Sequence, residues 1–299
     1  MNSPNFPRGL ALMLVALCCL TVCGCTALKV QWAMRSVKVN QNIAFAQVDG
    51  RSLGLDIYSP KKTSGKLPVV VWIHGGSWNS GSKDVCPIGF MAAQNLAVVS
   101  LDYRLVPAAT FPAQLHDCKA AIRWLRANAA KYNLDADHIG IFGASAGGHL
   151  ALLLATTADN PKMEGDVGGN LNFSSRVQCV CAFYPPTDLN RLVSNPKIRA
   201  SPDGDVAKLI GGAVADNVDK ANFASPLYYV DKKCAPVFLM HGGADELVPP
   251  EQSKIFFEAL KNAGVEAQLE IIPGQGHGII APPAPAKKIH QFFQTHLKS

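Results

Sequence analysis

Short apolar runs alternate along the chain with stretches of helical periodicity, and turn-forming residues separate the two kinds of segment. Residues 113–130 and 286–296 are predicted to be helices, because their apolar residues recur every three to four positions. Strands that alternate with helices indicate a mostly parallel sheet with helices on both faces. The predicted strands are 67–73, 96–101, 177–184, 237–240 and 267–272.

Two segments depart from this alternation. Asp49-Gly50 separates two strand-like runs, 42–48 and 51–58, and is typical of a tight hairpin turn, so the sheet is expected to begin with an antiparallel hairpin. Residues 188–224 have weak periodicity and many turn formers. That segment is expected to form either a cap or pocket wall over the site described below, or an irregular surface excursion.

The strongest chemical signal is the run Gly143-Ala144-Ser145-Ala146-Gly147, which has the pattern G-x-S-x-G. A short apolar run precedes it and a helical run follows it. Such a serine lies on a sharp strand-to-helix turn, where its hydroxyl is held out at the carboxyl edge of the sheet. The pattern alone is weak, but its placement makes Ser145 the candidate nucleophile.

A serine hydroxyl needs a histidine to accept its proton and a carboxylate to orient that histidine. Asp245 follows the predicted strand 237–240, and His277 lies between glycines after the strand 267–272. The order Ser145, Asp245, His277 is that of the α/β-hydrolases. Asp188 also follows a predicted strand and is the less favoured alternative for the acid.

A loop rich in glycine follows the strand 67–73 and is predicted to form an oxyanion hole, a set of backbone donors for the charge that develops on the attacked carbonyl. Gly76 and Ser77 are the expected donors in this loop, and Gly75 is expected to support its turn. Ala146, which follows the nucleophile, is expected to supply a further N–H.

Several neighbouring residues receive supporting roles. His74 is expected to anchor its own loop and His149 to be a packed or capping residue. Asp102 and Arg104 are expected to form a structural pair beneath the oxyanion loop. The candidate pocket residues are Trp78, Pro186, Leu247 and Val248.

These motifs together resemble a known group of proteins. His74-Gly75-Gly76, the run 101–107 (Leu-Asp-Tyr-Arg-Leu-Val-Pro) and the Ser145 elbow look like the hormone-sensitive-lipase-like and the feruloyl- and acetyl-esterase-like branches of the α/β-hydrolase superfamily. The lipase-like branch usually has a third glycine at the position of Ser77, which favours the esterase branch. The segment 240–245 with His277 is also similar to prolyl-oligopeptidase-type peptidases and dienelactone hydrolases.

Composition agrees with a globular protein and disfavours one that binds nucleic acid. The 299 residues are 48% hydrophobic and 17% charged, and the net charge of +6 is spread along the chain rather than gathered in a basic stripe. Residues 41–299 are expected to form one α/β-hydrolase domain, preceded by a linker over 26–40. The five cysteines in this domain are expected to be mostly buried small side chains.

The first 25 residues predict export. Arg8 precedes an apolar run, residues 10–22, that is short for a bilayer span and suits a signal peptide. The run ends in Val22-Cys23-Gly24-Cys25, which resembles a bacterial lipobox with Cys25 as the acylated residue, although Cys23 is atypical there. The alternatives are ordinary secretion and, less favoured, an uncleaved anchor.

The sequence therefore predicts a serine hydrolase that cleaves carboxylic esters through an acyl-enzyme, with no metal or organic cofactor implied. The resemblance implies short acyl esters, including acetyl or feruloyl groups on carbohydrate, as substrates. A prolyl-oligopeptidase-like peptidase is the first alternative, and a non-catalytic ligand-binding surface lipoprotein is the second. The sequence leaves the oligomeric state open.

Overall fold

A computed structural model describes residues 30–194, 204–278 and 283–298. The predicted signal peptide, including Cys25, and part of the predicted cap lie outside these residues. No helix within the described ranges combines the length and apolar character that a bilayer crossing requires.

An eight-stranded sheet forms the centre of the described structure, with the strand order β1-β2-β4-β3-β5-β6-β7-β8. The strands from β3 to β8 are parallel, while β1 and β2 pair antiparallel with each other and β2 pairs antiparallel with β4. The strands are β1 (Val37–Val48), β2 (Arg51–Pro60), β3 (Leu67–Ile73), β4 (Ala97–Leu101), β5 (Leu134–Ala144), β6 (Cys179–Phe183), β7 (Val237–Gly242) and β8 (Ala267–Ile272).

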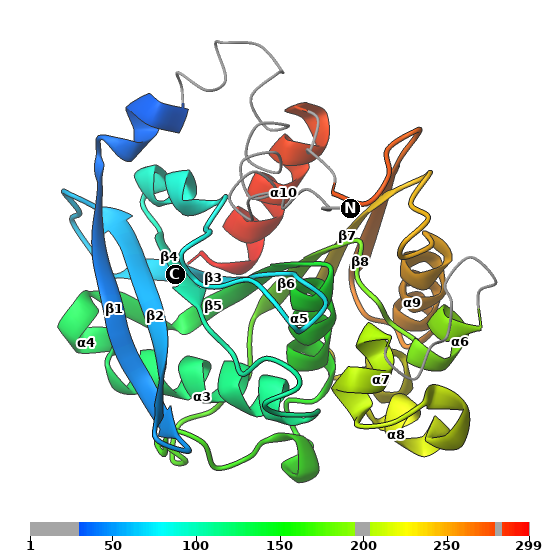
Figure 1. The fold of residues 1–299 in the computed structure, drawn as a ribbon. Coiled ribbons are helices and arrows are strands. Elements are labelled where there is room, and N and C mark those ends of the chain that lie inside the picture. The colour runs from blue at the N-terminus through cyan, green and yellow to red at the C-terminus, as the bar shows by residue number, and fades with distance from the viewer. Residues whose placement is uncertain (1–29, 195–203, 279–282, 299) are drawn as a thin grey trace, which may run out of the picture.

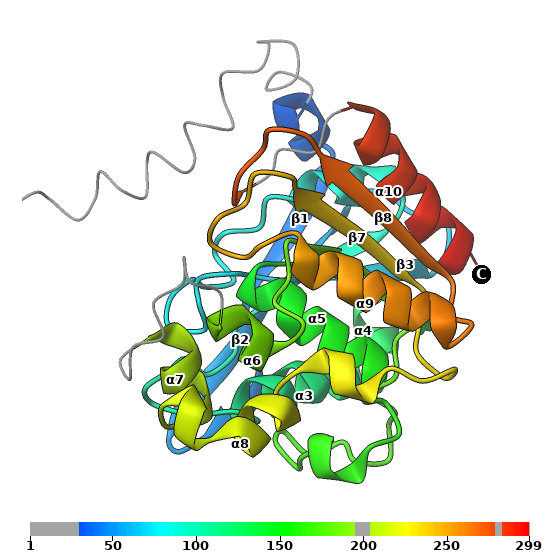
Figure 2. The same cartoon turned by 90° about the vertical axis from the view of Figure 1, so that its right-hand side faces the viewer.

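Helices cover both faces of this sheet, as the two views in Figures 1 and 2 show. One core layer contains side chains of α3, α5 and α9, and the other contains side chains of α10 and η1. The α-helices are α3 (Ala113–Ala127), α4 (Ala129–Tyr132), α5 (Ala146–Thr156), α6 (Leu189–Val193), α7 (Asp205–Ile210), α8 (Val218–Phe223), α9 (Glu251–Asn262) and α10 (Pro283–His296); the 3₁₀ helices are η1 (Gly89–Gln94), η2 (Pro161–Met163), η3 (Val214–Asp216) and η4 (Pro226–Tyr229).

The hairpin predicted around Asp49-Gly50 is confirmed, and both turn residues have positive φ, 51° and 74°. Positive φ at both central residues is what the type I′ turn of a two-residue hairpin requires. The strand β1 begins at Val37, inside the stretch expected to be a linker (26–40), because Val37 is buried and pairs with Pro60. A short helix over 30–34 precedes it.

The predicted helix 113–130 is divided in the structure. Its main part, α3, ends at Ala127, and Asn128 then separates it from the single turn α4. The amide of Asn128 donates to the Trp124 carbonyl, which satisfies one of the free carbonyls at the end of α3.

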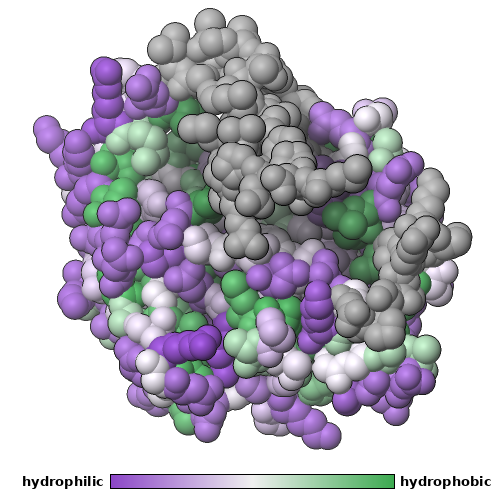
Figure 3. All heavy atoms as spheres, viewed as in Figure 1, coloured by the Kyte–Doolittle hydropathy of each residue, from purple (hydrophilic) through white to green (hydrophobic). Residues whose placement is uncertain are grey.

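On the face shown in Figure 3, hydrophilic residues cover most of the surface that is not grey, with smaller hydrophobic areas between them. The described cysteines 86, 118, 179, 181 and 234 are all free. Four of them are buried and Cys86 is half-buried, which agrees with their expected role as small apolar side chains.

Candidate active site

Ser145 lies between β5 and α5 with φ 55° and ψ −122°, a strained conformation that turns the chain sharply. Two glycines make this turn sterically accessible. A Cβ atom at Gly147 would lie 2.1 Å from the carbonyl oxygen of Ile73, and one at Gly143 would lie 2.2 Å from that of Gly147. The Ser145 amide donates to the Phe183 carbonyl at 2.9 Å, which ties the turn to the end of β6.

The structure brings Ser145, His277 and Asp245 together across three strand ends. The Nε2 atom of His277 is 3.0 Å from the Ser145 hydroxyl, and its Nδ1 atom is 2.8 Å from Oδ2 of Asp245. Because β5, β7 and β8 are parallel, the loops that follow them lie at one edge of the sheet. A hydroxyl, an imidazole and a carboxylate in this line can pass a proton from the serine to the histidine.

Hydrogen bonds hold the Asp245 side chain in its ionised form. Burial raises the pKa of Asp245, but donors from His241, His277 and the Val248 amide outweigh burial and lower that pKa well below its ordinary range. The other carboxylate oxygen accepts from the amides of Leu247 and Val248, at 3.0 and 2.9 Å. The acid is therefore fixed in both orientation and charge.

His241 is a site residue that the sequence analysis missed. Its Nε2 atom is 3.3 Å from Oδ2 of Asp245 and 2.8 Å from the Val248 carbonyl, so Nε2 carries the proton. Its Nδ1 atom accepts from the Ser253 hydroxyl at 2.7 Å. The sequence did contain a signal for this role, because His241 is a polar residue at the end of the apolar run of β7, four positions before Asp245.

Tyr184 is a second missed residue. Its ring packs against the imidazole of His277 at a centroid distance of 4.5 Å and an interplanar angle of 61°. The backbone at Tyr184 has φ 38°, which bends the chain as it leaves β6. This contact limits the orientations that the His277 ring can take.

The predicted oxyanion loop lies directly against Ser145. A Cβ atom at Gly75 would be 3.3 Å from the Ser145 Cβ, and Ser77 lines the same cavity as Ser145 and Ala146. Gly76 has φ 109°, and a side chain there would meet the Ser80 carbonyl at 2.4 Å. Glycine at position 76 therefore permits the backbone path that presents this loop to the serine.

Two histidines contact the oxyanion loop: His74, which was expected to anchor it, and His149, which was expected to be a packed or capping residue. His74 stacks on Tyr103 and donates from Nδ1 to the Gly75 carbonyl at 2.8 Å. The indole N–H of Trp78 donates to Nδ1 of His149 at 3.2 Å, and Nε2 of His149 donates to the Ala224 carbonyl at 2.7 Å. Burial lowers the pKa of His149 to about 4, so this buried ring is neutral.

The expected pairing of Asp102 with Arg104 is wrong. Arg104 instead forms a bidentate ion pair with the buried Asp117 of α3, with a shortest distance of 2.8 Å. Asp102 accepts from the Lys83 amide at 2.8 Å and so fixes the far end of the oxyanion loop. The alternative acid, Asp188, caps α6 through the Arg191 amide at 3.0 Å.

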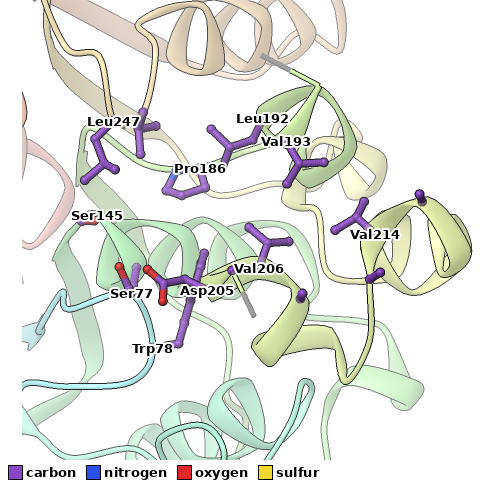
Figure 4. Close-up of a pocket in the computed structure, with 16 residues that line it drawn as sticks. Ser77, Trp78, Ser145, Pro186, Leu192, Val193, Asp205, Val206, Val214 and Leu247 are labelled. Atoms are coloured by element: carbon purple, nitrogen blue, oxygen red, sulfur yellow. The ribbon is translucent and has the colours of Figure 1, made fainter. Parts of the chain in front are cut away.

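A cavity of about 510 Å³ opens beside Ser145 (Figure 4). The four candidate pocket residues all line it, and helices α6 and α7 with η3 form its far wall. Residues within 188–224 thus provide a wall over the serine. The lining residues are Ser77, Trp78, Ser145, Ala146, Pro186, Leu192, Val193, Gly204, Asp205, Val206, Ala207, Ala213, Val214, Ala215, Leu247 and Val248.

Several curated proteins resemble this chain in sequence. The chain is 31% identical over 230 residues to the esterase LipC of Mycobacterium tuberculosis, covering 75% of this chain and 56% of LipC. It is 30% identical over 262 residues to the carboxylesterase NlhH of the same species, covering 78% of this chain and 76% of NlhH. The chain spans about half the length of several of its curated relatives.

Solved structures of esterases also resemble this chain. A truncated carbohydrate esterase from gut microbiota superposes with a TM-score of 0.81 at 31% identity, covering 88% of this chain and 97% of that one. The sequence model of the BD-FAE family matches residues 55–260, more than half of the chain. With its α/β-hydrolase fold, the chain therefore belongs to the BD-FAE family, among the α/β-hydrolase esterases.

Proposed function

We propose that the protein is a serine hydrolase that cleaves carboxylic esters, with Ser145 as nucleophile, His277 as general base and Asp245 as the orienting acid. The observation that carries this proposal is the hydrogen-bonded line from the Ser145 hydroxyl through His277 to Asp245. The Ser145 hydroxyl, at one end of this line, borders an open cavity in which an ester carbonyl has room to approach it. The esterases among the relatives support the reaction class.

In the proposed mechanism, His277 removes the proton from Ser145 as the serine oxygen attacks the acyl carbon. Backbone amides of Gly76, Ser77 and Ala146 stabilise the oxyanion of the tetrahedral intermediate. His277 then gives its proton to the departing alcohol, which leaves the acyl group on Ser145. Water, activated by the same histidine, releases the acid and restores the serine.

For the substrate, we propose short acyl esters of carbohydrates, with acetyl and feruloyl esters as the first to test. The cavity of about 510 Å³ has room for a small acyl group together with part of a sugar. Similarity to a carbohydrate esterase over 88% of the chain supports this choice.

Hydrolysis of p-nitrophenyl esters from acetate to dodecanoate tests the proposed chemistry. We expect the wild-type protein to hydrolyse the short esters and Ser145→Ala to lose about 10⁴-fold or more in kcat. Ser52→Ala, on the exposed side of β2, is the matched control and retains activity. Equal inactivity of wild type and Ser145→Ala on every ester, with cleavage of aminoacyl p-nitroanilides, would favour the peptidase alternative.

We further propose that the protein is exported and carries a lipid on Cys25, which anchors it to a membrane. The lipobox-like sequence at residues 22–25 supports this proposal. In bacterial cells supplied with labelled palmitate, Cys25→Ala is expected to lose the label and enter the soluble fraction. Cys23→Ala is the control and is expected to keep the label; a label on Cys25→Ala would contradict lipidation at this residue.

A further inference from the structure

The cavity beside Ser145 has one charged residue among the described residues that line it, Asp205. The other polar side chains in this lining are the hydroxyls of Ser77 and Ser145, together with the indole of Trp78, whose N–H already donates to His149. The rest of the lining is aliphatic or glycine. A carboxylate in an otherwise apolar substrate cavity is stabilised by each hydrogen-bond donor that reaches it, because water solvates it less completely once a substrate enters.

The position of Asp205 is fixed relative to the oxyanion loop. Its Oδ1 atom accepts a hydrogen bond from the side-chain amide of Asn79 at 2.8 Å. Asn79 lies two residues after Ser77 on the loop that borders Ser145. In Figure 4 the Asp205 carboxylate, at the start of α7, lies near Ser77, and both residues line the cavity. The carboxylate is half-buried, so it remains accessible from the cavity.

A carboxylate accepts hydrogen bonds and donates none, so its complement in a substrate is a hydrogen-bond donor, and in the alcohol half of an ester that donor is a hydroxyl group. The alcohol half of a carbohydrate ester carries several hydroxyls, whereas a cycloalkyl alcohol of the same size carries none once it is esterified. A site built to bind a hydroxyl discriminates strongly against an analogue that lacks it, because the buried polar group is then left without a partner.

We propose that Asp205 is a specificity-determining residue that accepts hydrogen bonds from hydroxyl groups on the alcohol half of the ester. This inference rests on the ester hydrolase activity proposed above. The same placement predicts selection against anionic substrates, since a second carboxylate in this cavity would face Asp205 without a cation in the described lining.

A pair of substrates of matched size tests the inference: a mono-O-acetylated methyl xyloside and cyclohexyl acetate. We expect Asp205→Ala to lower the ratio of kcat/KM for the sugar ester to that for cyclohexyl acetate by roughly 10- to 100-fold. Asp205→Asn keeps the shape and an acceptor for Asn79, and is expected to lower the ratio by a smaller factor. This second variant also keeps the test valid where Asp205→Ala folds poorly.

The outcomes separate this inference from the proposed function. Equal losses on both substrates, with a lower Tm, would mean that Asp205 only attaches the cap to the oxyanion loop, and would overturn the inference. Wild-type activity on cyclohexyl acetate without activity on the sugar ester would also overturn it, while leaving ester hydrolysis intact. Inactivity of the wild type on both substrates and on p-nitrophenyl acetate would instead contradict the proposed function.

Discussion

The Nε2 atom of His241 lies 3.3 Å from Oδ2 of Asp245, and both side chains are completely buried. The same carboxylate oxygen is 2.8 Å from Nδ1 of His277. The acid of the proposed triad therefore depends on a second histidine for its ionised state and its orientation, although this second histidine does not line the cavity.

We expect His241→Leu to lower kcat on p-nitrophenyl acetate by about 10-fold or more, since a hydrogen bond to a charged group is lost. The KM should change little, because His241 has no access to substrate. His241→Gln, whose amide can still donate to Asp245, is expected to recover much of the rate. A raised KM at constant kcat in His241→Leu would contradict a positioning role.

The identity of the acid is tested by two matched substitutions. Asp245→Asn is expected to reduce kcat by about 10³-fold or more, because an amide no longer selects the correct His277 tautomer or stabilises its imidazolium. Asp188→Asn, which can still cap α6, is expected to keep kcat within about twofold. A larger loss in Asp188→Asn than in Asp245→Asn would reverse the assignment. Initial rates on p-nitrophenyl acetate measure both.

The turn at Ser145 is expected to lose stability when a single methyl group is added at Gly147. The added Cβ would lie 2.1 Å from the Ile73 carbonyl oxygen, so Gly147→Ala must displace β3 or α5. We expect a loss of about 2 kcal/mol or more in the free energy of unfolding, measured by urea titration. Gly65→Ala, where a Cβ meets open space, should change it by less than about 0.5 kcal/mol.

The titration of His149 is expected to make the folded protein less stable as the pH decreases. Its pKa is about 4 in the folded protein, against about 6.5 in an unfolded chain. The unfolded state therefore takes up a proton between these values while the folded state does not, and stability is lost as the pH falls through this window. From pH 8 to pH 5, this residue should reduce the free energy of unfolding by about 2 kcal/mol.

Urea titrations of the wild type and His149→Gln at both pH values measure that contribution. Gln can still donate to the Ala224 carbonyl but does not titrate. Between pH 8 and pH 5 the free energy of unfolding of His149→Gln should therefore fall by about 2 kcal/mol less than that of the wild type. His74, whose pKa burial also lowers, contributes in the same direction in both proteins. Identical pH dependence in the two proteins would show that His149 does not titrate on unfolding.

The positions of Ser145, Asp245 and His277 were predictable because parallel strands end at one edge of a sheet, so motifs that follow strands meet there. The partner of Arg104 was not predictable in this way. Proximity in sequence suggested Asp102, but α3 brings Asp117, thirteen positions further along the chain, against the arginine. That pairing depends on how a helix packs rather than on local spacing.

The contact between Asp205 and Asn79, and that between His241 and Asp245, could not be predicted from the sequence either. Asn79 and Asp205 are separated by 126 positions, and weak periodicity in 188–224 gave no indication of which cap residue faces the serine. The sharing of Asp245 between two imidazoles requires the exact fold of the loop after β7. A pattern of apolar residues determines which face of a strand is buried, but not how such a loop folds back.

The far wall of the cavity comes from a part of the chain that is separate from the turns carrying Ser145, Asp245 and His277. The proposed reacting groups stand on turns after β5, β7 and β8, whereas α6, α7 and η3 enter as one insertion between β6 and β7. Substitutions at Val206, Val214 or Asp205 can therefore remodel the insertion while the proposed reacting groups keep their positions. Divergence of substrate preference among relatives should concentrate in this insertion.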